Sequence, residues 1–262
     1  MTRVLSALVL IPLVVGTVWF LPPGGTLTLA LVAAMLSLVE YARIAGAMGV
    51  RIPVAVTAAA VVAVCVAVGA GLPWTDVILM SAVLVVGALA VAQGTTNPGL
   101  LHGAAAAVFA IAYIGLPLGA IAAVRAFAGR EAVILMMATI VVSDSAQYYC
   151  GRAFGRTPLA PAISPKKTRE GAVGGLIFGT AAMAVGGRWV FPDAPMLLLV
   201  LVAATITALG MVGDLFESML KRSAGVKDSS QLIPGHGGVL DRIDSWLFAA
   251  PLYYVFVRYL RL

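Results

Sequence analysis

The chain has 262 residues, of which 61% are hydrophobic and 11% are charged, with a net charge of +6 and a mean hydropathy of +1.04. The charged share is less than half of the roughly 25% that soluble domains carry, and apolar runs of about 20 residues, long enough to cross a bilayer, recur along the chain. This composition excludes a soluble globular domain and predicts an integral membrane protein. The positive net charge suits an anionic leaflet but does not identify a partner.

Nine helices are predicted in chain order from the apolar runs and from the Pro- and Gly-containing breakers between them. The breakers are PPGG at 22–25, GLP at 71–73, NPG at 97–99 and PDAP at 192–195. The expected helices are Val4–Leu21, Thr26–Ala45, Pro53–Ala70, Asp76–Ala92, Gly103–Phe127, Glu131–Cys150, Gly171–Gly186, Pro195–Arg222 and Arg242–Leu260. The predicted fold class is therefore all-α, a polytopic integral membrane protein with about nine transmembrane helices.

The first apolar run, Val4–Leu21, follows Arg3 and has the general form of a secretory signal. It is long for such a signal, and no A-x-A-like cleavage site follows it. We therefore expect it to be a retained membrane helix.

The distribution of Lys and Arg predicts how these helices are oriented. With a cytoplasmic amino terminus, twelve of the 17 basic residues fall on the inner side and five on the outer side, which agrees with the positive-inside bias. The opposite orientation violates this bias. The amino terminus is therefore predicted in the cytoplasm and the carboxyl terminus outside.

The chain is predicted to form a single membrane domain whose two halves differ in polarity. Residues 1–130 contain only two acidic residues, Glu40 and Asp76, and are rich in Ala, Val, Leu and Gly. We expect this half to be a scaffold of transmembrane helices. Residues 131–262 carry most of the polar side chains and are expected to form the catalytic region with its cytoplasmic loops.

The first group of polar residues is SDSAQYYCGRAFG, Ser143–Gly155, which continues an apolar run without a break. Asp144 and Gln147 are three residues apart and are expected on one helix face, at the cytoplasmic end of that helix. A carboxylate at the centre of a membrane helix costs roughly 2.5–3.5 kcal/mol on insertion scales, so Asp144 is a candidate substrate-binding residue. The alternative is a charge that merely extends to the membrane interface.

The second group is SPKKTREGAVGG, Ser164–Gly175, expected to be a loop that gathers basic side chains ahead of a glycine run. Basic groups near a helix start can hold phosphate, because backbone N–H groups and the helix dipole point outward there. Lys166 and Lys167 are therefore candidate substrate-binding residues. A topological anchor beside anionic lipid headgroups explains the same pattern equally well.

The third group combines the helix end GDLFESMLKR with the polar segment QLIPGHGG and the start of the last helix, LDRID. Its carboxylates, Asp214, Asp241 and Asp244, come from two helix ends that are expected to converge. Oxygen ligands completed by water and substrate phosphate are those that Mg²⁺ prefers, so these three residues are the candidate metal and catalytic residues. The hypothesis admits a second cation. An ion-paired cytoplasmic loop is the alternative.

Basic residues and glycines surround these carboxylates. The bases can neutralise phosphate charge, and the glycines let backbone approach a ligand closely. His236 is a candidate catalytic residue that could act as a general base. A single His in a glycine loop fits a hydrogen-bond donor to phosphate, or a structural anchor, equally well. The remaining candidates are Lys221 and Arg222 for catalysis and Ser218, Lys227, Gly237, Gly238 and Arg242 for substrate binding.

The segment Ser218–Asp244 resembles the signature of the phosphatidate cytidylyltransferases, also called CDP-diacylglycerol synthases. SPKKTREGAVGG and SDSAQYYCGRAFG resemble other blocks of that family, so the likeness covers about residues 140–245, whereas the amino-terminal half is similar only in its hydrophobic texture. Arg169 and Gln147 depart from the family pattern without removing a fixed charge. The signature positions that match are Ser218, Lys221, Arg222, Lys227, Asp228, Pro234, His236, Gly237, Gly238, Asp241, Arg242 and Asp244.

The resemblance implies a membrane enzyme, forming homodimers, that joins phosphatidic acid to CTP and yields CDP-diacylglycerol and diphosphate, with Mg²⁺ required. A phosphatidate oxygen is expected to attack the α-phosphorus of CTP in line, so that positioning and charge neutralisation carry the reaction. The expected location is the cell inner (cytoplasmic) membrane, with the active site facing the cytoplasm where CTP meets the lipid headgroup. We expect no nucleic-acid partner.

Two rival functions are weighed against this one. A transporter or flippase of an anionic lipid or nucleotide often shows internal repeats and binding groups near the membrane midplane, whereas the polar residues here gather in one half and at one face. A CDP-alcohol phosphotransferase also uses clustered Asp and metal, but its D-G-x2-A-R pattern does not occur in this sequence. Formation of a liponucleotide from CTP and phosphatidate separates all three.

Overall fold

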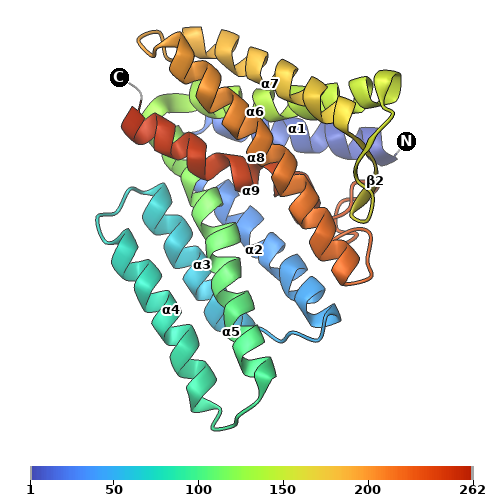
Figure 1. The fold of residues 1–262 in the computed structure, drawn as a ribbon. Coiled ribbons are helices and arrows are strands. Elements are labelled where there is room, and N and C mark those ends of the chain that lie inside the picture. Colours follow the sequence, from blue (N-terminus) through green and yellow to red (C-terminus); the bar gives the residue numbers. More distant parts are fainter. Residues whose placement is uncertain (1, 261–262) are drawn as a thin grey trace. The chain divides into compact units, whose positions relative to one another are not determined.

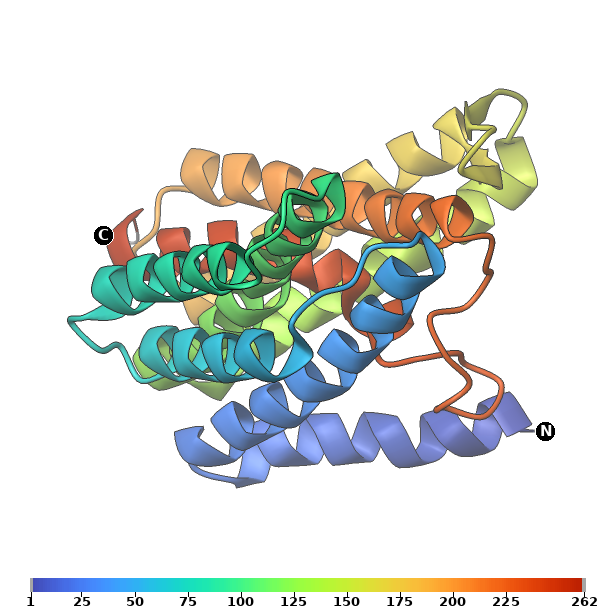
Figure 2. The same cartoon turned by 90° about the horizontal axis from the view of Figure 1, so that it is seen from below.

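The structure is a computed structural model that describes residues 2–260. Nearly all of its elements are helices, and they form two compact units. The first unit contains the described residues up to Ala126 together with Leu220–Arg242, and the second contains Phe127–Met219 and the described residues from Ile243 onward. Figure 1 and Figure 2 trace the chain through these elements.

The first unit is built around helix α3. It contains α1 (Thr2–Phe20), α2 (Pro23–Ala47), α3 (Val54–Gly69), α4 (Thr75–Ala92), α5 (Pro98–Ala110), the π-helical turn η1 (Ile111–Gly115) and the start of α6 (Leu116–Phe154). Its second segment adds the end of α8 (Met196–Ser223), the loop that follows, and the first turn of α9 (Leu240–Val255). Helix α3 packs against α2, α4, α5 and η1, and its Val61, Val64 and Cys65 are fully buried.

The second unit contains the rest of α6, most of α8 and α9, and a hairpin that leads into α7. Its own elements are β1 (Pro158–Ala160), β2 (Ser164–Thr168), α7 (Arg169–Val190) and the π-helical turn η2 (Phe256–Leu260). The two strands are antiparallel and pair Pro158 with Thr168 and Ala160 with Ser164. The Tyr253 hydroxyl on α9 donates to the Ala132 carbonyl on α6 at 2.8 Å, within a buried part of this unit.

The predicted breakers correspond to real helix boundaries. Proline has a fixed φ that suits the first turn of a helix, and Pro23 and Pro98 stand at the starts of α2 and α5. The Asn97 side chain caps α5 by accepting the Gly99 N–H at 2.8 Å. Over the described residues, the nine predicted segments are helical apart from single residues at some ends. Gly103–Phe127 runs through α5, η1 and the start of α6, and Arg242–Leu260 through α9 and η2.

One of these boundaries is a kink at a glycine, within the residues assigned to α6. Gly129 interrupts α6 with φ 88° and ψ 179°, a conformation that favours glycine because it has no Cβ. The break lies between the predicted helices Gly103–Phe127 and Glu131–Cys150 and confirms that division.

The segment Ser164–Gly175 is not the loop that its sequence predicts, although its last residues belong to the predicted helix Gly171–Gly186. Ser164–Thr168 is strand β2, and the helix α7 begins directly after it, capped by Thr168, whose Oγ1 accepts the Gly171 N–H at 3.1 Å. The strand forms because Pro158–Ala160 supplies its backbone partner, which the pattern of the loop alone does not reveal. The hairpin is a small β element in an otherwise helical fold.

Glycines allow close helix contacts within each unit. A Cβ on Gly119 of α6 would lie 2.8 Å from the Cys65 carbonyl oxygen of α3, and a Cβ on Gly174 of α7 would lie 2.5 Å from Cys150 Sγ of α6. Both distances are shorter than any tolerated contact, so only glycine permits these helices to approach so closely. The GAVGG run thus has a packing role in α7.

Within residues 2–260, five helical stretches are long and apolar enough to cross a bilayer: Pro23–Ala47, Thr75–Ala92, Pro98–Phe154, Arg169–Val190 and Met196–Ser223. The stretch Pro98–Phe154 is 57 residues long and contains two of the predicted helices. Shorter apolar helices are found at Ser6–Phe20 and Val54–Gly69. The chain is therefore a multi-pass α-helical membrane protein, whereas nine spans and the orientation of the termini stay predictions.

Candidate active site

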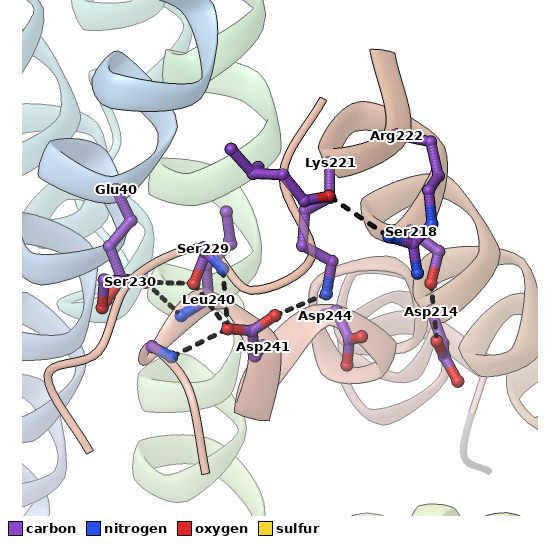
Figure 3. Close-up of polar contacts among 12 residues, drawn as sticks. Glu40, Asp214, Ser218, Lys221, Arg222, Ser229, Ser230, Leu240, Asp241 and Asp244 are labelled. Carbon is purple, nitrogen blue, oxygen red and sulfur yellow. Dashed lines mark hydrogen bonds and ion pairs between the residues drawn. The ribbon is translucent and has the colours of Figure 1, made fainter. Parts of the chain in front are cut away.

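Five of the predicted site residues lie in two polar clusters, one in each unit. The first, the loop cluster, surrounds the segment that joins α8 to α9 and consists of Glu40, Lys221, Ser229, Ser230 and Asp241. The second, the hairpin cluster, consists of Lys167, Asp214 and Ser218. Figure 3 shows the side chains of the loop cluster together with Asp214 and Ser218.

An ion pair lies at the centre of the loop cluster. Lys221 Nζ is 2.5 Å from Asp241 Oδ1, and the two side chains are only 11% and 5% exposed. Lys221 lies in the last turn of α8 and Asp241 in the first turn of α9. Each charge is therefore at the helix end where the helix dipole favours it.

The second oxygen of Asp241 is held by the loop itself. Oδ2 accepts the Ser229 N–H at 2.9 Å, the Ser229 hydroxyl at 2.7 Å and the Gly238 N–H at 2.7 Å. Burial raises the pKa of Asp241, but the hydrogen bonds from Lys221, Gly238 and Ser229 and the charge of Lys221 outweigh it and lower this pKa to about 2. The Asp241 carboxylate is thus ionised at neutral pH.

Glu40 of α2 is the part of the cluster that sequence reasoning missed, since it was assigned to the scaffold half. Its side chain is buried, with 2% of the residue exposed. Its two carboxylate oxygens accept hydrogen bonds from the hydroxyls of Ser229 and Ser230 at 3.0 and 2.7 Å and from the N–H groups of Val239 and Leu240 at 3.0 and 2.7 Å (Figure 3). An available signal was the isolated carboxylate in an apolar helix, because such residues mark functional sites by default.

The glycine pair of the loop is packed against these two carboxylates. A Cβ on Gly237, whose φ is +79°, would lie 2.5 Å from Asp241 Oδ2, and a Cβ on Gly238 would lie 2.4 Å from both carboxylate oxygens of Glu40. The close approach predicted for these glycines is therefore made to protein carboxylates. Their predicted contacts with substrate stay a prediction.

His236 is bonded to the first helix. Its Nδ1 lies 2.6 Å from Ser6 Oγ, and the Ser6 hydroxyl donates to the Pro234 carbonyl at 3.1 Å. Within the loop, the His236 N–H donates to Ile233 O at 2.9 Å and the Ile233 N–H to Gly237 O at 2.8 Å. These contacts tie His236 to α1 and to its own loop, and its role in catalysis stays a prediction.

The hairpin cluster joins β2 to α8. Lys167 Nζ forms an ion pair with Asp214 Oδ2, and the Ser218 hydroxyl donates to Asp214 Oδ1 at 3.5 Å. The Lys167 and Asp214 side chains are 22% and 31% exposed, so a ligand can reach them. Lys166, the preceding residue, is exposed on the hairpin.

Glu170 stabilises the base of the same hairpin. One carboxylate oxygen accepts the Arg156 N–H at 3.1 Å, and both accept the Thr157 N–H at 3.2 Å. Glu170 thereby ties the segment after α6 to the first turn of α7. It holds the strand that carries Lys166 and Lys167.

Asp144 lies on α6. It is exposed, and its Oδ1 accepts a hydrogen bond from Gln147 Nε2 at 3.0 Å. The predicted alignment of these two residues on one helix face is therefore confirmed. Gln147 also contacts Ser143 Oγ at 3.4 Å.

The remaining predicted residues lie near the same helix ends. Arg222 is exposed, and its Nη1 donates to the Val226 carbonyl at 3.3 Å. Lys227 and Arg242 are also exposed, and Asp244 Oδ1 accepts the Ser245 N–H at 2.7 Å. These basic groups present charge to solvent beside the loop cluster.

In the structure, two of the predicted metal ligands face lysines. Asp241 Oδ1 pairs with Lys221 Nζ, and Asp214 Oδ2 pairs with Lys167 Nζ. Over the described part of the chain, no three His, Cys, Asp or Glu side chains are grouped so as to hold a metal ion. The convergence of Asp214, Asp241 and Asp244 on one cation stays a prediction.

A family profile described as "Cytidylyltransferase family" matches residues 1–260. The chain belongs to the cytidylyltransferase family. The match extends over nearly the whole chain, so it includes the amino-terminal half as well as the signature.

Proteins named phosphatidate cytidylyltransferase are similar to this chain. One from Haemophilus influenzae is 46% identical over 118 residues, which are 44% of this chain and 41% of that protein. Phosphatidate cytidylyltransferase 5, chloroplastic, of Arabidopsis thaliana is 46% identical over 131 residues, 50% of this chain and 32% of that protein. The chain thus matches less than half the length of these two relatives. One from Staphylococcus epidermidis is 29% identical over 257 residues, 96% of this chain and 95% of that protein.

Proposed function

We propose that this chain is a phosphatidate cytidylyltransferase that transfers CMP from CTP to phosphatidic acid and forms CDP-diacylglycerol and diphosphate. Membership of the cytidylyltransferase family and the names of its relatives support a CTP-dependent transferase. The single observation that carries the proposal is the buried Lys221–Asp241 pair, which the signature segment builds from residues at two helix ends.

The chemistry needs little covalent work from the protein. Phosphatidate is already anionic at neutral pH, since the second pKa of a phosphate monoester is about 6, so its oxygen attacks the α-phosphorus of CTP without a strong base. The protein aligns the two substrates and neutralises their charge. His236 is accordingly a binding or anchoring residue rather than a general base.

Asp214, Asp241 and Asp244 are the residues that would hold Mg²⁺. The proposal allows either one or two cations. When bound, the cation supplies charge neutralisation for the phosphates. Asp241 and Asp214 each pair with a lysine in the structure. If these carboxylates held a cation, Lys221 and Lys167 would be able to contact a phosphate oxygen.

The other basic residues complete the charge neutralisation. Lys166 and Lys167 are carried by the hairpin, and Arg222 lies at the end of α8. They are proposed to contact the phosphates of CTP or of the lipid, together with Lys221, Lys227 and Arg242. Asp144 is proposed to orient one of these lysines or to bind substrate.

The location proposed for the enzyme follows from its substrates. CTP is a cytoplasmic solute and phosphatidate lies in the bilayer, so the active site faces the cytoplasm at the inner membrane. Nine spans, with the amino terminus inside and the carboxyl terminus outside, agree with the distribution of basic residues. A homodimer is proposed from the family resemblance.

The decisive experiment incubates purified protein with labelled CTP, phosphatidate and Mg²⁺ and looks for a labelled liponucleotide and diphosphate. We expect both products, formed only when phosphatidate is present. Asp244→Asn should abolish turnover while membrane insertion stays normal. Diphosphate release without a lipid product, or movement of labelled lipid across vesicles without one, overturns the proposal.

A further inference from the structure

We propose that Glu40 of α2 is a positioning residue for the loop cluster. Its carboxylate caps the start of α9, holds the loop Ser229–Leu240, and through that loop fixes the Asp241 carboxylate. The proposal rests on the proposed function insofar as Asp241 belongs to the active site. All of its residues lie in the first unit.

The cap at α9 comes from a distant helix. The first N–H groups of a helix have no partner within it and are usually satisfied by a side chain just before the helix. The residue before α9 is Val239, whose side chain accepts no hydrogen bond. Glu40, 200 residues away in the chain, accepts the Leu240 N–H at 2.7 Å, and its other oxygen accepts the Val239 N–H at 3.0 Å.

The loop is built closely around this carboxylate. A buried carboxylate is costly unless its oxygens are hydrogen-bonded, and Glu40 has four donors from the loop. Gly238 leaves space for it, because any Cβ there would meet both Glu40 oxygens at 2.4 Å. The absence of a side chain at Gly238 therefore allows the Glu40 carboxylate to reach its four donors.

Ser229 carries the effect of Glu40 to Asp241. Its hydroxyl oxygen lies 3.0 Å from Glu40 Oε2 and 2.7 Å from Asp241 Oδ2. One hydroxyl proton is thus shared between two carboxylates, and the Ser229 N–H adds a second bond to Asp241. Displacing the loop from Glu40 moves two of the groups that hold Asp241 opposite Lys221.

The test compares Glu40→Gln with Ser37→Ala in the full-length protein in detergent. Gln keeps the size of the side chain but has one acceptor oxygen, so it cannot accept the Val239 and Leu240 N–H groups as a carboxylate does. Ser37 is a matched control, since it is buried one turn earlier on α2 and has no hydrogen bond to the loop among the described contacts. Ser230→Ala removes a single donor and serves as a milder second variant.

Two measurements are made on each variant. Hydrogen–deuterium exchange should become faster in peptides covering Ser229–Leu240 of Glu40→Gln, with other peptides of the first unit unchanged. The kcat for liponucleotide formation should fall about 10- to 100-fold, with a smaller change in KM, because misplacement of a catalytic group is felt most in the transition state. Ser230→Ala should show the same pattern at smaller size, and Ser37→Ala should match the wild type.

The outcomes separate this proposal from the proposed function. Wild-type exchange and kcat in Glu40→Gln overturn the positioning role, and so does faster exchange spread evenly over α1–α5, which indicates general destabilisation. If Glu40→Gln does not fold, wild-type exchange and kcat in Ser230→Ala overturn it. The exchange measurement needs no turnover, so a wild-type protein that makes no liponucleotide refutes the proposed function alone.

Discussion

Lys221 and Asp241 form an ion pair almost entirely withdrawn from solvent, although one residue ends a helix and the other begins the next. Their side chains are 11% and 5% exposed, and Nζ lies 2.5 Å from Oδ1. A buried pair of this kind contributes little to stability compared with apolar side chains, yet breaking it by removing one partner is costly. Its position in the signature segment agrees with a functional role.

The first prediction concerns that pair. Lys221→Gln should lower the free energy of unfolding by about 3 kcal/mol, because it leaves the Asp241 carboxylate buried without its charge partner. Denaturant titration in detergent micelles measures the change. The control is Arg130→Gln, which breaks an exposed pair with Glu131 whose side chains are 44% and 51% exposed; we expect a loss below about 1 kcal/mol. Equal losses in the two variants contradict the prediction.

The second prediction concerns Gly238. Gly238→Ala should reduce activity at least about tenfold, because the added Cβ would meet Ser229 Oγ at 2.1 Å and the Glu40 oxygens at 2.4 Å and must displace the two groups that hold the loop and Asp241. Initial rates of diphosphate release measure it. Gly46→Ala on α2 is the control, since nothing lies within 4 Å of its added Cβ. Full activity in Gly238→Ala would show that the loop can move without affecting the site.

The third prediction concerns the cation. Removal of divalent ions with EDTA should abolish liponucleotide formation, and added Mg²⁺ should restore it. Asp214→Asn should raise the Mg²⁺ concentration needed for half-maximal rate, since an amide is a weaker ligand for a hard cation than a carboxylate. Turnover that persists in EDTA, or an unchanged Mg²⁺ requirement in the variant, argues against this assignment.

The fourth prediction concerns topology. In a background without Cys65 and Cys150, Lys227→Cys should react with a membrane-impermeant maleimide only after permeabilisation, whereas Asp193→Cys should react in intact spheroplasts. Both positions are exposed, and the positive-inside bias places them on opposite sides. The reverse labelling pattern would invert the proposed orientation and place the loop cluster outside.

Local sequence predicts the helices of this protein well. The NPG breaker marks the start of α5 because Asn97 and Pro98 have short-range roles there, a cap and a preset φ. The signature segment likewise indicated Lys221 and Asp241, since charged side chains are scarce in this chain. Such features depend on residues that are neighbours along the chain.

Other features became visible only in three dimensions. The hairpin at Ser164–Thr168 needs a backbone partner from Pro158–Ala160, and the GAVGG run is explained by the helices against which it packs. Glu40 is the clearest case, because its sequence neighbours are apolar and every hydrogen-bond donor recorded for it comes from Ser229–Leu240.

The sequence by itself determined that this is a helical membrane protein, where most helices begin and end, and to which family its polar signature points. These properties follow from hydropathy over about 20 residues and from contacts within one or two turns. The tertiary structure alone decided that a carboxylate of α2 caps α9 and that Gly238 leaves space for this carboxylate. The physical reason is that a hydrogen bond depends on distance in space, and 200 residues of chain separate Glu40 from Leu240, whose N–H donates to it.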